Sequence, residues 1–307
     1  MKFKNSIAII IPYFGHWPNY FNVFLKGCEN NKWLHILFFT DCDVPDKHYE
    51  NINFIPYTLN DFNNLASKKL GKKIAISKAY KLCDFKPTYG LIFEDYLSEY
   101  DYWGYGDIDL IYGNLEPFIL NRISEGYDVL SNREEILSGS LSIFRNTPAL
   151  KRLFTQSPKL VSLLDSTEYE GLDETAHCHI TWQGGNKTDL PPHCFTYLIH
   201  SEHVLGNIKA SFVTTCKEEV NNKEIVSYRD GCLYFDNQPL AYYHYVCNKN
   251  QPGYILPNWS AVPSHFFIST TGFYRTAKFY LFVHLYRKFT GMITNLSSRA
   301  WKRLIKR

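Results

Sequence analysis

The stretches SIAIIIP, residues 6–12, and LHILFFTD, residues 34–41, decide the fold. Each is a nearly continuous apolar run of strand length, which is typical of a strand buried on both faces of a parallel sheet. Residues 20–28, between them, space their apolar side chains as a helix does. The order strand, helix, strand predicts a β-α-β unit at the start of the chain.

The same alternation continues outward from this unit. Residues 229–232 also contain an Asp-Gly pair suited to a tight hairpin. We expect helices near residues 75–83 and 148–154, and strand-like segments at 53–56, 102–106, 110–112, 128–130, 139–144, 225–228, 232–235 and 240–245. This order predicts an α/β fold, a mostly parallel Rossmann-like sheet flanked by helices, whose ligands bind beyond the carboxyl ends of the strands.

The composition is that of a globular protein. The chain has 307 residues, of which 45% are hydrophobic and 21% charged, so it can bury a large core. No apolar run suggests a polytopic membrane protein, and the run that stops at Pro12 is too short for a signal peptide. The eight cysteines form no C-x-x-C pair, which indicates reduced thiols. We therefore expect a cytoplasmic protein.

Two carboxylates stand together in the stretch DYWGYGDIDLIYGNL, residues 101–115. Asp107 and Asp109 are two residues apart on an extended segment, so their side chains point the same way and can share one hard cation. Mn²⁺ or Mg²⁺ at this pair would bind phosphate oxygens and neutralise a leaving diphosphate. The alternative is a solvated turn at a strand end. A second D-x-D, Asp41 and Asp43, lacks this strand context.

Five segments, taken in order, resemble one family. They are IIIPYFG (9–15), FFTD (38–41), KAYKLCDFKPTYG (78–90), GDIDLIYGN (106–114) and SGSLSIFRN (138–146). The series is similar to bacterial GT-A-type nucleotide-sugar glycosyltransferases of polysaccharide and O-antigen clusters, and the likeness covers roughly residues 6–250. It implies a GT-A-like fold and a nucleotide-diphosphate sugar, with a UDP-sugar as the expected donor.

The resemblance also implies which residues bind this donor. The first loop would lie against the base, Asp41 and Asp84 would contact the base or ribose, and a lysine would hold the diphosphate. Asp109 is the expected direct metal ligand, with Asp107 beside it. The full donor-binding set is Pro12, Tyr13, Phe14, Asp41, Lys81, Asp84, Lys86, Asp107 and Lys249. For the loop residues the alternative is packing, and for the charged residues it is a solvated helix end.

A histidine late in the chain completes the metal shell in related GT-A enzymes, and a following lysine holds phosphate. His244 and Lys249 match these positions, so the expected metal ligands are Asp107, Asp109 and His244. The glycine-rich spacing usual between the two is missing here, which leaves Lys249 the less secure of the pair. A histidine packed in the core is the alternative for His244.

Glycosyl transfer removes a proton from an acceptor hydroxyl, and an inverting enzyme supplies a carboxylate base for it. Asp173 is the preferred candidate and Glu174 the second, in the irregular stretch YEGLDETAHC, residues 169–178. A retaining enzyme would need no such base. Trp103 and Trp182 are candidates for sugar stacking, with core packing as the alternative.

The C-terminal segment has a basic and amphipathic pattern. Residues 273–307 contain nine Lys and Arg and no Asp or Glu, whereas the rest of the chain has 24 basic and 30 acidic residues. Apolar residues recur between these charges at helical spacing, which favours a helix lying on an anionic membrane surface over one docked on the body. We expect two parts, a GT-A-like domain at 1–262 and a basic helical extension at 263–307, and a peripheral location at the inner face of the cytoplasmic membrane.

Together these features predict a metal-dependent glycosyltransferase. It would move a sugar from a nucleotide-diphosphate sugar to a glycan acceptor, lipid-linked, in cell-surface polysaccharide (O-antigen or capsule) biosynthesis, with no nucleic-acid partner. One alternative is a non-catalytic nucleotide- or glycan-binding module of the same fold. Another is a sugar-1-phosphate nucleotidyltransferase, which would need a glycine-rich loop after the first strand, where only Gly15 stands.

Overall fold

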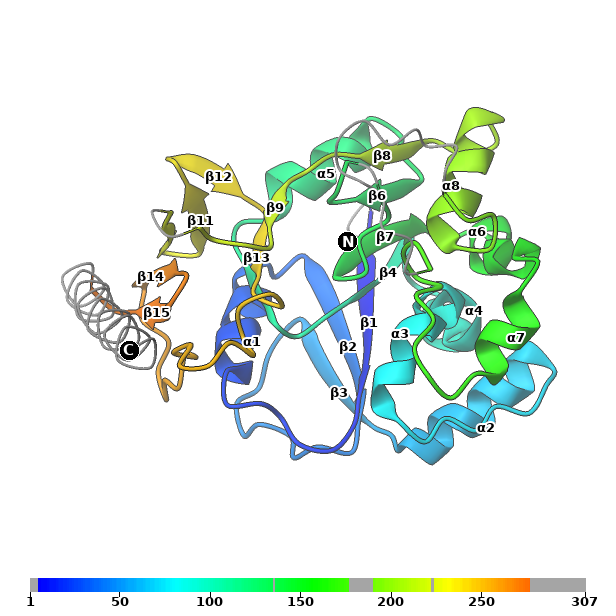
Figure 1. The fold of residues 1–307 in the computed structure, drawn as a ribbon, viewed down its shortest axis with the longest axis horizontal. Coiled ribbons are helices and arrows are strands. Elements are labelled where there is room, and N and C mark those ends of the chain that lie inside the picture. The colour runs from blue at the N-terminus through cyan, green and yellow to red at the C-terminus, as the bar shows by residue number, and fades with distance from the viewer. Residues whose placement is uncertain (1–4, 135, 177–189, 222–223, 277–307) are drawn as a thin grey trace, which may run out of the picture.

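A seven-stranded sheet forms the centre of the computed structural model, which describes residues 5–134, 136–176, 190–221 and 224–276 (Figure 1). All neighbouring strands pair in parallel except β7, which runs antiparallel to both its neighbours. The order across the sheet is β3 (Ile52–Pro56), β2 (Leu34–Thr40), β1 (Ile7–Tyr13), β4 (Tyr102–Gly106), β7 (Leu141–Arg145), β6 (Val129–Ser131) and β8 (Ala210–Phe212). The predicted α/β class with a mostly parallel sheet is confirmed.

Strand β1 lies between two cores, as its apolar sequence predicts. Alternate side chains point to opposite faces of a strand, so Ala8 and Ile10 pack into one core while Ile7 and Ile9 pack into the other. All four side chains are inaccessible to solvent. The helices α1 (Phe21–Asn30) and α5 (Glu116–Ser124) cover the Ile9 face.

A larger set of helices covers the Ala8 face. Its members are α2 (Leu59–Leu70), η1 (Ala79–Lys81), α3 (Leu82–Phe85), η2 (Lys86–Thr88), α4 (Tyr89–Ile92), η3 (Glu94–Tyr96), α6 (Pro148–Arg152), η4 (Leu153–Gln156), α7 (Leu160–Asp165) and α8 (Phe195–Val204). Helix α2 was not predicted from the sequence, although Thr58 and Asp61 form a capping box at its start and Gly71, at φ 68°, ends it.

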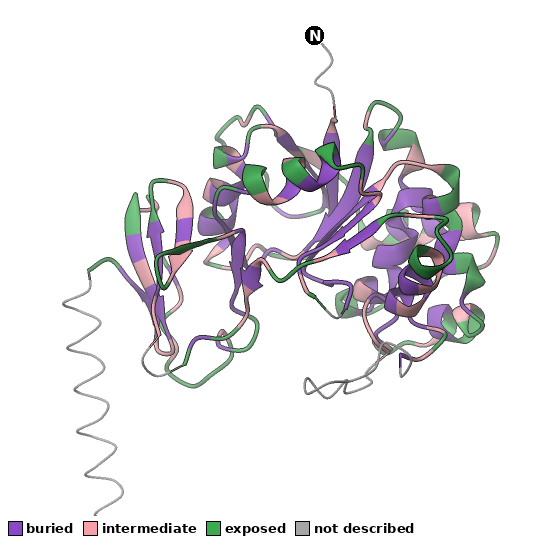
Figure 2. Ribbon diagram, turned by 90° about the horizontal axis from the view of Figure 1, so that it is seen from above, coloured by how far each residue is buried: buried purple, intermediate pink, exposed green. Residues whose placement is uncertain are grey.

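Two smaller sheets are built mostly from the second half of the chain. One joins β5 (Leu110–Tyr112), β13 (Tyr242–His244) and β9 (Cys216–Lys217). The other joins β12 (Gln238–Leu240), β11 (Cys232–Phe235), β10 (Val226–Arg229), β14 (His265–Ser269) and β15 (Gly272–Tyr274), at one end of the molecule (Figure 2). The predicted hairpin is present, since Asp230 and Gly231, at φ 47° and 89°, link β10 to β11.

The first part of the segment expected to be a helical extension, residues 263–307, forms strands instead. Strands β14 and β15 occupy residues 265–274 and complete the sheet of β10, while residues 277–307 lie outside the described part of the chain. The helical extension and the two-part division therefore stay predictions. Among the described residues, no helix is long and apolar enough to span a membrane.

Candidate functional site

A cavity of about 410 Å³ opens at the carboxyl ends of β1 and β4. Its wall is formed by the end of β1, the loop between β4 and β5, the short helices η1 and α3, and the chain around residues 169–174. This is the edge at which parallel α/β sheets bind their ligands.

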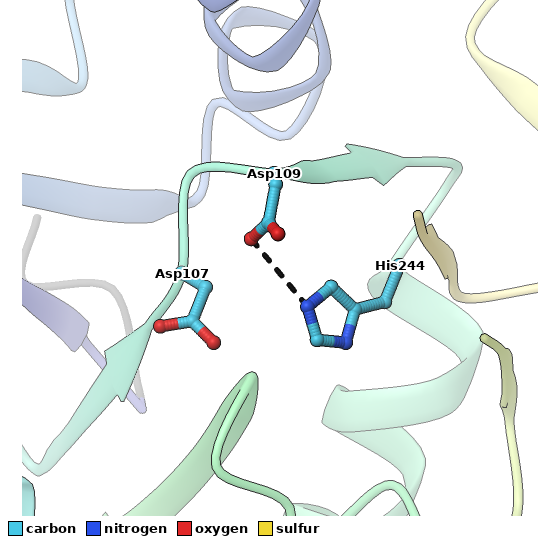
Figure 3. A group of neighbouring side chains, drawn as sticks. All are labelled: Asp107, Asp109 and His244. Carbon is cyan, nitrogen blue, oxygen red and sulfur yellow. Dashed lines mark ion pairs between the residues drawn. The ribbon is translucent and has the colours of Figure 1, made fainter. Parts of the chain in front are cut away.

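Three potential metal ligands gather at the cavity wall (Figure 3). Asp107 follows β4 and Asp109 precedes β5, whereas His244 is the last residue of β13. Because β13 pairs antiparallel with β5, with His244 opposite Leu110, strand register brings the histidine next to Asp109. One ligand atom from each of the three side chains lies within 4.8 Å of the others.

Asp109 is surrounded by cations. Its Oδ1 lies 3.4 Å from His244 Nε2 and its Oδ2 accepts a hydrogen bond from Lys249 Nζ at 2.6 Å. Burial alone would raise the pKa of Asp109, but these two partners hold it well below its usual range. The side chain is therefore an anion although it is only 7% exposed.

His244 is held between two carboxylates. Its Nδ1 lies 3.3 Å from Glu218 Oε1, and Arg133 pairs with the same Glu218 carboxylate. Burial would lower the pKa of His244, but the hydrogen bonds to Asp109 and Glu218 outweigh it and raise the pKa to about 9. Glu218 thus orients the ring through Nδ1 while Nε2 faces Asp109. A carboxylate commonly orients metal-binding histidines in this way.

A second group of charges lies across the cavity. Lys86 Nζ donates to Asp107 Oδ1 at 2.7 Å and to the carbonyl of Gly139 at 2.8 Å, and lies 3.7 Å from Asp173 Oδ2. Tyr169 Oη donates to Asp173 Oδ1 at 2.8 Å. Burial outweighs the effect of Lys86 and raises the pKa of Asp173 to about 8. This carboxyl group therefore binds a proton more tightly than an exposed aspartate does.

Glu174 lies beside this group. Its Oε1 accepts a hydrogen bond from the Gly139 amide at 2.9 Å. A Cβ on Gly139 would stand 2.7 Å from that same oxygen and 3.0 Å from Asp173 Oδ2. Glycine at this position therefore lets the backbone approach both carboxylates closely.

The structure brings most of the predicted site residues to one cavity. Those that line it are Pro12, Tyr13, Phe14, Lys86, Asp107, Asp109, Asp173, Glu174, His244 and Lys249. Their shared location agrees with a single site, while the role assigned to each stays a prediction.

Three predicted donor-binding residues do not line the cavity. Asp41 Oδ1 accepts a hydrogen bond from the amide of Gly15 at 2.7 Å and so shapes the first loop. Lys81 and Asp84 form a buried ion pair with each other. Trp103 is fully buried against Phe144 and offers no stacking surface.

Several residues of the site carry no signal in the sequence. Tyr20, Tyr80 and Tyr169 line the cavity, and Glu218 and Arg133 support His244. Tyr80 and Tyr169 lie within stretches quoted above, but nothing in those stretches marks them as site residues. No motif marks Glu218 or Arg133, because their partners lie far away in the chain. Trp182 lies outside the described residues.

Comparison with known proteins places the chain in a family. A family model described as "Family of unknown function (DUF6625)" matches residues 9–277, so the chain belongs to that family. No curated protein matches it.

The solved structures that the chain resembles include three glycosyltransferases. Mouse xyloside xylosyltransferase 1, in its apo form, is 11% identical over 81% of this chain and 99% of that chain, with a TM-score of 0.41. The galactosyltransferase LgtC, in complex with donor and acceptor sugar analogues, is 11% identical over 80% and 88%, with a TM-score of 0.39. The apo glycosyltransferase GlyE of Streptococcus pneumoniae TIGR4 is 13% identical over 67% and 45%, with a TM-score of 0.33.

Proposed function

We propose that this member of a family of unknown function is a metal-dependent glycosyltransferase that uses a nucleotide-diphosphate sugar as donor. One observation carries the proposal. The group formed by Asp107, Asp109 and His244 faces the same cavity as Lys249 and the carboxylates of Asp173 and Glu174. A metal site, a cation for phosphate and a base are the parts that a metal-dependent inverting transfer from a nucleotide sugar uses.

The three potential ligands fit a divalent cation. Two carboxylates and an imidazole within 4.8 Å of one another form a mixed oxygen and nitrogen set, which suits Mn²⁺ and, with more water ligands, Mg²⁺. A cation bound there would neutralise the charge of a leaving diphosphate. Asp109, held as an anion, would be the principal ligand, and Glu218 would orient His244.

The end of β1 is the proposed nucleotide site. Pro12, Tyr13 and Phe14 line the cavity there. Lys249, in the turn that follows β13, donates a hydrogen bond to Asp109. The aromatic rings offer a surface for a base, and the lysine offers positive charge for the phosphates. On the sequence resemblance we propose a UDP-sugar as donor.

Asp173 is the proposed base that accepts the proton of the acceptor hydroxyl in an inverting reaction. A general base works best when its pKa lies near the operating pH, and the pKa of Asp173 is raised to about 8. Lys86, 3.7 Å away, would stabilise the ionised form of Asp173, which is the form that accepts the proton. Glu174 is the neighbouring candidate.

The cellular setting of the proposal rests on sequence. We propose a lipid-linked glycan acceptor in O-antigen or capsule synthesis, and a peripheral place at the inner face of the cytoplasmic membrane through the basic residues 273–307. The full chain is then expected to sediment with vesicles containing anionic lipid at low salt, and to be released by about 0.5 M salt because the charges are screened. Binding that salt does not weaken would contradict this mode of attachment.

A thermal-shift experiment tests the donor site. The melting temperature of the full chain is measured with a panel of nucleoside diphosphates and nucleotide sugars, with and without Mn²⁺, for the wild type, Asp109→Asn and Asp43→Asn. Asp43 belongs to the other D-x-D and is exposed, so it is a matched control. We expect one nucleotide to raise the melting temperature only with Mn²⁺, in the wild type and Asp43→Asn but not in Asp109→Asn.

Two results would change this conclusion. If no nucleotide stabilises the folded wild type, the donor site is wrong. If a nucleotide sugar binds but is neither hydrolysed nor transferred to any of a panel of methyl glycosides, the chain is a binding module rather than an enzyme.

A further inference from the structure

Lys81 and Asp84 form an ion pair inside the protein. Lys81 Nζ lies 2.8 Å from Asp84 Oδ2, and the two side chains are 2% and 0% exposed. Neither residue lines the cavity. A buried ion pair adds little net stability by itself, because both groups lose their hydration. The structural role of the pair is therefore found in the remaining hydrogen bonds of the ammonium and carboxylate groups.

Those other bonds run to the backbone of one segment, residues 163–172. Lys81 Nζ donates to two carbonyl oxygens, and Asp84 accepts from two amides. The partners are the carbonyls of Leu163 and Glu168, each at 2.7 Å, and the amides of Glu170 and Leu172, at 2.7 and 2.8 Å. Residues 166–171 form neither helix nor strand. Buried backbone groups in such a segment need side-chain partners, and the pair supplies them.

The segment leads directly into the cavity. Asp173 follows it, and Tyr169, within it, donates a hydrogen bond to Asp173. The short helical stretch that contains the pair also contains Lys86, which reaches Asp107 on the other side of the cavity. One stretch of chain thus bonds both to the loop of potential metal ligands and to the segment that ends in the proposed base.

We infer that the Lys81–Asp84 pair positions Asp173. It fixes segment 163–172 so that the carboxyl group lies within reach of Tyr169 and Lys86, at a set place relative to Asp107. The pair itself touches no ligand. The inference rests on the proposed function for the task of Asp173, and it adds two positioning residues that act from outside the cavity wall.

Two measurements on the full chain test this inference. The variants are Asp84→Asn, which removes the charge and leaves one oxygen for two amides, and Lys81→Gln, which retains a donor and serves if Asp84→Asn does not fold. The control is Lys69→Met, which breaks a partly buried ion pair with Glu94 and Asp95 elsewhere on the same face of the sheet. Hydrogen exchange is followed on peptides covering 163–176, and kcat and KM are measured with the nucleotide sugar found by the assay above.

We expect exchange in 163–176 to become at least tenfold faster in Asp84→Asn and Lys81→Gln but not in Lys69→Met. We expect kcat to fall at least tenfold while the donor KM changes less than threefold, because the nucleotide side of the cavity is not touched. Unchanged kcat in a variant with faster exchange would overturn the inference. If the wild type turns over no nucleotide sugar, the proposed function fails. The positioning role is then decided by hydrogen exchange alone, and unchanged exchange in both variants would overturn it.

Discussion

The two sides of the cavity are built in different ways. On the metal side, formed by Asp107, Asp109, His244 and Lys249, strand register places His244 beside Asp109, since β13 pairs with β5. On the carboxylate side, formed by Tyr169, Asp173 and Glu174, an irregular segment is placed by buried side-chain bonds. Regular pairing needs no special residues, whereas the irregular segment depends on one ion pair.

The same residue type behaves oppositely on the two sides. Asp109 and Asp173 are both buried, but the pKa of Asp109 lies well below its usual range and the pKa of Asp173 is raised to about 8. The difference follows from the partners of each carboxyl group. Asp109 has His244 at 3.4 Å and Lys249 at 2.6 Å, whereas Lys86 lies 3.7 Å from Asp173 and is hydrogen-bonded to Asp107 instead. Burial therefore raises the pKa of Asp173, whose nearest cation is shared with a second carboxylate.

The largest expected effect separates the two sides by function. Asp173→Asn is expected to lower the rate of sugar transfer by about 10²–10⁴-fold, because the acceptor hydroxyl loses its base. The same variant should retain the Mn²⁺-dependent stabilisation by nucleotide, which Asp109→Asn should lose. Transfer rates with saturating donor and thermal shifts measure both quantities. A transfer rate within threefold of the wild type would remove Asp173 from the reaction.

A second, smaller effect concerns the pH dependence of stability. The pKa of Asp173 is about 8 in the folded protein and near 3.8 in an unfolded chain. Between these values the folded protein holds a proton that the unfolded chain has released, so the free energy of unfolding falls as the pH rises through this range. Asn at this position cannot ionise. Asp173→Asn is therefore expected to be more stable than the wild type at pH 9, by about 2 kcal/mol, and to show little gain at pH 5.

Urea unfolding at the two pH values, with exposed Asp43→Asn as control, measures this difference. A gain of equal size at both pH values would mean that Asp173 is already ionised at pH 5. The contrast between the two sides of the cavity would then be wrong.

The sequence predicted the parts of this protein that depend on local pattern. The apolar runs of β1 and β2 place the sheet, and the spacing of Asp107 and Asp109 after an extended segment places the carboxylates at its edge. The grouping of His244 with them came from a resemblance, since register between β13 and β5 is a long-range property. The resemblance implied that Asp84 contacts the ribose and a lysine the diphosphate. A sequence does not show which way the side chains of a helix end point, and Lys81 and Asp84 point toward each other inside the protein.

The smallest expected effect tests whether the metal side depends on residues behind its ligands. Glu218 touches His244 Nδ1 and pairs with Arg133, but does not line the cavity. Glu218→Gln keeps the size of the side chain and removes the charge that orients the imidazole ring. Replacing such a partner of a metal ligand typically costs about 10–100-fold in metal affinity, and we expect about tenfold here because Gln still offers an oxygen to the ring. Mn²⁺ titration by isothermal calorimetry measures the change, with Glu224→Gln, which breaks the half-buried ion pair with the neighbouring Lys217, as control. Equal Mn²⁺ affinity in the two variants would mean that strand register alone places His244, and that the metal side needs no support comparable to the Lys81–Asp84 pair across the cavity.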